Sequence, residues 1–256
     1  MSFPFRQGLL AAAFAAFSVG ASADVVFDNI SAPLNGDGGT LSATSSTPNT
    51  FMGGGYILSP GTTQITGFDL FPYNNTGTNF TDLKLNIYVW GGVNTGTVSA
   101  ASPAFSNLLG SYSFTSSGDF STGFFYSFQD PDAPGTTPAL SLSTPLNISS
   151  NTVGISVNVQ GSTDGGATFS SVNSLTSVLT YGTAPSVGGL VFNGYFRNAA
   201  GETNGNFTSN VRSLGQTDQG VAMRIYGNVS AVPEPSSWAL MGLGMMGLLA
   251  WRRRSV

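Results

Sequence analysis

Residues 81–90 read TDLKLNIYVW, and the alternation within this stretch decides the fold. Aliphatic side chains occupy every second position and polar or aromatic side chains lie between them; the aliphatic set is Leu83, Leu85, Ile87 and Val89. Successive side chains of a β-strand point to opposite faces, so the pattern predicts a strand with one buried face. The same period of two recurs in TVGISVNV at 152–159 and in VAMRIYG at 221–227.

Shorter apolar segments of the same kind extend this pattern to most of the chain. They predict further strands at 24–30, 56–58, 63–71, 111–115, 124–128 and 189–196. Stretches rich in Gly, Asn and Asp separate them, and these residues favour tight turns. No segment between Asp24 and Ala231 shows a stripe of apolar residues at helical spacing.

The expected fold class is therefore all-β, a single antiparallel β-sandwich of jelly-roll-like organisation. The proline-rich stretch QDPDAPGTTP at 129–138 is interpreted as a long loop inside this one domain rather than as a domain boundary.

Composition removes many catalytic chemistries. The chain has no histidine and no cysteine, which excludes an imidazole base, a thiolate nucleophile, disulfides and thiolate-bound zinc. Between residues 24 and 231, ten aspartates and Glu202 stand against one lysine and three arginines, a net charge of −7. That sign argues against nucleic acid or anionic lipid as a partner of this segment.

The N-terminal residues have the order of a secretory signal peptide. Arg6 is followed by an apolar stretch at 9–19 and then by Ala21-Ser22-Ala23, with small residues at the two positions that signal peptidase requires. Cleavage is expected before Asp24, so that residues 1–23 are the signal peptide and the remainder is exported.

The C-terminal residues predict a short transmembrane helix. Trp238–Trp251 is an unbroken run of fourteen apolar or glycine residues, about 21 Å of helix. Arg252, Arg253 and Arg254 follow it, and such a cluster stops transfer and stays on the cytoplasmic side. The segment before the helix is then held outside the inner membrane.

The order of parts in residues 232–256 resembles the PEP-CTERM sorting signal of Gram-negative bacteria. Pro233, Glu234 and Pro235 form the motif, and the apolar helix and the arginine cluster follow it. The resemblance implies recognition by an exosortase, a membrane-embedded protease, which removes the tail and passes the protein to the cell surface or the exopolysaccharide of a biofilm matrix. Residues 24–231, the body, are also similar in strand order to exported β-sandwich proteins that carry this tail, a similarity that assigns no site.

We expect the body to be non-catalytic, with a structural or adhesive role in the exopolysaccharide layer and without a metal or other cofactor. The alternative is a carbohydrate-binding module, in which Tyr88 and Trp90 lie on the polar face of the strand at 81–90 and stack on sugar rings. A carboxylate-based glycosidase is the least favoured hypothesis. It needs two convergent carboxyl groups, and the linear order identifies no partner for Glu202.

Overall fold

The computed structural model of the protein describes residues 23–30, 50–130, 136–172, 174–197, 205–208 and 217–230. Every regular element in these ranges is a β-strand, and every strand pair is antiparallel. The predicted all-β, antiparallel class is confirmed. The predicted signal peptide up to Ser22 and the sorting tail at 232–256, with its expected helix, lie outside the described residues. Within the described ranges there is no helix of the length and hydropathy needed to cross a membrane.

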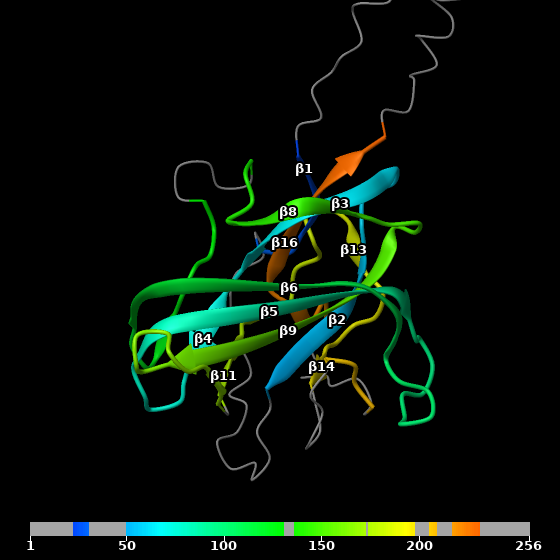
Figure 1. Ribbon diagram of the computed structural model, residues 1–256. Helices are drawn as coiled ribbons and strands as arrows, with labels where there is room; N and C mark the ends of the chain where they lie inside the picture. Colours follow the sequence, from blue (N-terminus) through cyan, green and yellow to red (C-terminus); the bar gives the residue numbers. More distant parts are fainter. Residues whose placement is uncertain are drawn as a thin grey trace, which may run out of the picture.

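Two sheets make up most of the body (Figure 1). The smaller one has the strand order β1 (Asp24–Asp28), β16 (Met223–Val229), β3 (Thr62–Leu70) and β8 (Leu140–Asn147). The larger one has the order β13 (Gly189–Leu190), β2 (Phe51–Ile57), β9 (Thr152–Ser162), β5 (Phe80–Val93) and β6 (Phe105–Phe120). Two short strands extend it: β10 (Ser170–Ser171) pairs with β9, and β14 (Phe196–Arg197) pairs with β2.

Two small sheets complete the set. One joins β11 (Leu175–Ser177), β4 (Pro72–Asn74) and β7 (Phe124–Phe125), and the other joins β12 (Leu179–Thr180) and β15 (Gly220–Val221). They lie in the connections between the longer strands and supply backbone partners there, since a buried unpaired N–H or C=O group is costly.

The pairing of the eight long strands is nested. In chain order these strands are β1, β2, β3, β5, β6, β8, β9 and β16, and the first pairs with the last, β1 with β16. The second pairs with the last but one, β2 with β9; the third pairs with β8, and the middle two pair as β5 with β6. One long antiparallel hairpin folded over into two sheets gives this order, which is that of a jelly roll.

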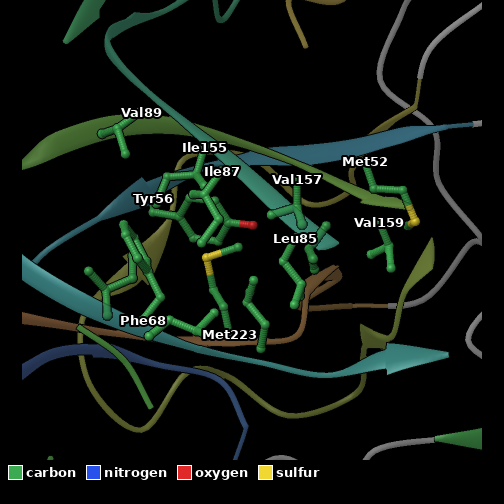
Figure 2. Close-up of a cluster of buried hydrophobic side chains, with 14 of the residues drawn as sticks. Met52, Tyr56, Phe68, Leu85, Ile87, Val89, Ile155, Val157, Val159 and Met223 are labelled. Carbon is green, nitrogen blue, oxygen red and sulfur yellow. The ribbon is translucent and has the colours of Figure 1, made fainter. Parts of the chain in front are cut away.

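The main core lies between the two large sheets (Figure 2). Leu85 and Ile87 of β5 and Val157 of β9 project from the larger sheet toward Phe68 of β3 and Met223 of β16. All four aliphatic residues of the 81–90 stretch are fully buried, so the predicted buried face is confirmed; they are Leu83, Leu85, Ile87 and Val89.

The structure differs from the predicted strands at several places. Strand β8 was not predicted, because half of LSLSTPLN is polar and the segment contains Pro145, a residue that is restricted to edge strands. The prediction at 56–58 missed most of β2, whose sequence FMGGGYI has three glycines at its centre. Conversely, the segment at 124–128 forms only the two-residue strand β7, while the segment at 111–115 is part of the sixteen-residue β6.

Candidate functional site

The outer face of the larger sheet carries aligned polar side chains. Lys84 of β5 lies opposite Gln160 of β9, and Asn86 lies opposite Asn158. All four alternate along their strands with buried aliphatic residues, and opposite residues of neighbouring strands lie on the same face. They therefore face away from the core between the sheets.

These residues form part of an open groove with a volume of about 420 Å³. The strands β5 and β9 provide its floor, and the start of β2 and the strand β10 provide residues at its sides. The lining consists of Thr50, Phe51, Lys84, Asn86, Tyr88, Asn158, Gln160 and Ser171. Six of these eight side chains are amides, hydroxyl groups or an ammonium, and two are aromatic rings.

Hydrogen bonds between side chains hold the floor of the groove in place. Ser113 Oγ donates to Asn86 Oδ1 at 2.7 Å, and Asn86 Nδ2 donates to Asn158 Oδ1 at 3.1 Å. Asn158 Nδ2 in turn donates to Ser171 Oγ at 3.2 Å and to the backbone oxygen of Thr50 at 2.5 Å. Because Asn158 is only 2% exposed, this chain fixes the amide orientations before any ligand arrives.

Lys84 is the single lysine of the whole chain, and it lies half-buried in this groove. Lys84 takes part in neither of the two ion pairs among the described residues, because both involve Arg224. The Lys84 ammonium lies 5.8 Å from the centre of the Phe169 ring, a cation–π distance. Its three N–H donors are the strongest donors that the groove offers to a ligand.

Tyr88 and Trp90, the two predicted sugar-stacking residues, lie in different environments. Tyr88 is half-buried, lines the groove and packs against Phe51 with 5.9 Å between ring centres. Trp90 is 6% exposed, its Nε1 donates to Ser156 Oγ at 3.3 Å, and its ring stacks on Phe105. The burial of Trp90 corrects the expected platform, because its ring presents no open face to a ligand.

Sequence reasoning missed the groove residues that β9 and β10 supply. Asn158 and Gln160 alternate with Val157 and Val159, so the polar face of β9 was visible in the sequence. What was missing was the register that sets Asn158 beside Asn86, which depends on two segments 72 residues apart. Ser171 belongs to a two-residue strand that has no sequence pattern of its own.

The remaining predicted positions are distributed as follows. Asp24, the expected new N-terminus, is the exposed first residue of β1 and pairs with Gly227 of β16. Ala23 immediately precedes that strand, whereas Ala21 is outside the described residues. The following predicted residues also lie outside the described residues: Glu202 and the tail residues Pro233, Glu234, Pro235, Arg252, Arg253 and Arg254. Among the described residues no group of three acidic, His or Cys side chains is placed to hold a metal ion.

The fold and the groove together define an antiparallel jelly-roll protein with a polar groove on the outer face of its larger sheet. A family model, the PEP-CTERM protein-sorting motif, matches residues 231–254. The chain therefore carries a PEP-CTERM motif at residues 231–254, as the resemblance implied, and this motif indicates an exported protein that an exosortase sorts. No curated protein and no solved structure gave a significant match.

Proposed function

We propose that the exosortase removes the tail and that the jelly roll is then a non-catalytic structural or adhesive component of the exopolysaccharide layer at the cell surface. The position of the sorting motif carries this proposal. Strand β16 ends at Val229, and the family match begins at residue 231, so that only Ser230 separates the two. Removal of the tail therefore delivers the jelly roll with almost nothing attached to it.

The intact mass of the protein recovered from the surface and medium of its native host tests this proposal. We expect a mass below that calculated for Asp24–Val256, with a deficit that matches loss of the tail. A Glu234→Ala variant is expected to keep the full-length mass and to remain in the membrane fraction. A full-length mass for the unaltered protein at the surface would show that the C-terminal segment is a permanent anchor.

The groove supports a second candidate function, a carbohydrate-binding module of the same layer. Sugars present hydroxyl groups around an apolar ring face, and proteins bind them with amides and with aromatic rings. The groove offers both: the side chains of Asn86, Gln160 and Lys84 lie beside the ring of Tyr88. Its pre-oriented amides reduce the entropy lost on binding.

Retention on purified exopolysaccharide in affinity electrophoresis tests this second candidate. We expect Lys84→Gln and Tyr88→Leu each to weaken retention by about tenfold, the loss of one good hydrogen bond or ring contact. Thr144→Ala, at an exposed position of β8 on the other sheet, is the matched control and should bind like the unaltered protein. Equal retention of all three variants would rule out binding in this groove.

The non-catalytic part of the proposal has its own measurement. Incubation of the protein with the exopolysaccharide should release no new reducing ends, whereas a glycosidase would release them in proportion to protein concentration and time.

A further inference from the structure

Strand β6 forms an edge of the larger sheet (Figure 1), and its first residue, Phe105, bonds through its backbone to the side chain of Asn206. It pairs with β5 from Phe105 to Phe120, and among the described residues no other strand pairs with it. An edge strand presents a row of backbone N–H and C=O groups without partners, which is a template for a further strand.

The central part of β6 lacks the features that usually protect such an edge. Charged side chains, prolines and bulges normally prevent strand addition. Between residues 105 and 118 there is no charged residue and no proline, whereas the edge strand β8 of the smaller sheet contains Pro145. The pairing with β5 shifts register near Leu108 and again between Ser117 and Phe120, and it runs without interruption from Gly110 to Ser117 between these two irregularities. These eight residues, GSYSFTSS, are the regular part of the edge.

The side chains along this regular part are partly exposed aromatic groups on one face and small polar groups on the other. Tyr112 and Phe114 pack against the main core but remain half-buried, and partial burial raises the pKa of Tyr112 above its usual value. Ser111, Ser113 and Thr115 are exposed on the opposite face. A strand added at this edge would complete the burial of both rings.

We propose that a second copy of this chain pairs with β6, strand against strand in antiparallel fashion, about a two-fold axis through Ser113. The axis position follows from the alternation of side chains. Core-facing residues must meet core-facing residues, because a slip of one position would exchange the two faces. An axis at Ser113 sets Tyr112 of each copy opposite Phe114 of the other, giving two aromatic cross-strand pairs.

Charge also favours this edge for self-association. The body has a net charge of −7, so two copies repel each other in general. The uncharged edge keeps like charges away from the contact itself. The resulting dimer has a single sheet that continues through both jelly rolls, and each copy carries one groove. The inference goes beyond the proposed function, because the dimer would be a bivalent adhesive unit.

The absence of cysteine from the chain permits a direct test by cross-linking. In the full-length protein expressed in its native host, Ser113→Cys places one thiol on the proposed axis, where the two Cβ atoms would be about 4.5–5.5 Å apart. We expect a covalent dimer on a non-reducing gel. Ser143→Cys, exposed on β8, is the matched control and should stay monomeric. A dimer from Ser143→Cys but not from Ser113→Cys, or equal amounts from both, would overturn the proposal.

Sedimentation of the exported protein provides a second test that needs no thiol. Ser113→Lys and Ser113→Asp should each weaken dimerisation by about tenfold or more, because like charges then meet on the axis. An equimolar mixture of the two variants should restore the dimer, which a merely misfolded variant would not do. A monomeric unaltered protein at the same concentrations, or a mixture that stays monomeric, would contradict the pairing.

Discussion

Arg224 is the residue that ties the smaller sheet together. It lies on β16 between two neighbours, and its guanidinium donates to Asp28 of β1 at 3.0 Å and to Asp69 of β3 at 3.2 Å. Asp69 is fully buried and accepts two further hydrogen bonds, from Tyr226 Oη at 2.7 Å and from the backbone N–H of Ala139 at 2.9 Å. A buried carboxylate with this many donors is stable only while all its partners remain.

Replacement of Asp69 should therefore strongly destabilise the protein. We expect Asp69→Ala to lower the free energy of unfolding by about 3–5 kcal/mol, because it leaves the buried Tyr226 hydroxyl without its acceptor and removes one of the two carboxylates that pair with Arg224. Asp119→Ala removes an exposed carboxylate of β6 and should change the free energy of unfolding by less than about 0.5 kcal/mol. Guanidinium unfolding curves compare the two, and similar values for both variants would contradict this role of Asp69.

The same cluster predicts a loss of stability in alkali. Burial, with the adjacent Asp69 carboxylate, raises the pKa of Tyr226 from 10.0 to about 12. Above pH 10 the unfolded chain loses the phenolic proton while the folded chain retains it, so the free energy of unfolding falls as pH rises from 10 to 12. In Tyr226→Phe this group is absent, and the stability gap between the two proteins should narrow over that interval. A constant gap in urea unfolding at pH 9 and pH 11.5 would contradict the shifted pKa.

At the scale of single elements, the predictions succeeded where one strand showed its own alternation. β5 and β9 are central, each has four fully or almost fully buried aliphatic positions, and period two was sufficient to predict them. The centre of β2 has no such pattern, because its glycines are required by packing: a Cβ on Gly53 would lie 2.4 Å from the backbone oxygen of Ile155.

The groove was only half predictable for a related reason. The polar face of β5 was readable, but the β9 register and the burial of Trp90 under Phe105 depend on long-range contacts.

Glycine packing within β9 leads to a prediction about this element. Gly154 lies under the ring of Phe105, and an added Cβ would come 2.4 Å from Phe105 Cδ1. We expect Gly154→Ala to lower the free energy of unfolding by about 1–3 kcal/mol, since the ring must move within a packed cluster. Gly189→Ala is the control, because its Cβ would be no closer than 3.8 Å to the atoms of Ile57. Thermal unfolding of both variants measures the difference, and equal melting temperatures would contradict it.

For the whole molecule, the nested pairing means that the two ends of the body must meet before the smaller sheet is complete. β16 lies between β1 and β3, and it is the last strand before the sorting tail. Contacts of such high sequence separation form late, because the loop they close costs entropy first. The smaller sheet therefore lacks a central strand until the final residues of the body have been exported.

This argument predicts different outcomes for two truncations that differ by only twelve residues. A chain that ends at Ala231 keeps β15 and β16 and should be folded and resistant to protease. A chain that ends at Gln219 loses both strands and exposes the apolar faces of β1 and β3, including Phe27 and Phe68, so that it should be degraded or aggregate. Limited proteolysis and near-ultraviolet circular dichroism distinguish the two. If the shorter chain were equally resistant, β16 would not be needed to close the fold. If the longer chain were sensitive, the tail would contribute to folding as well as to sorting.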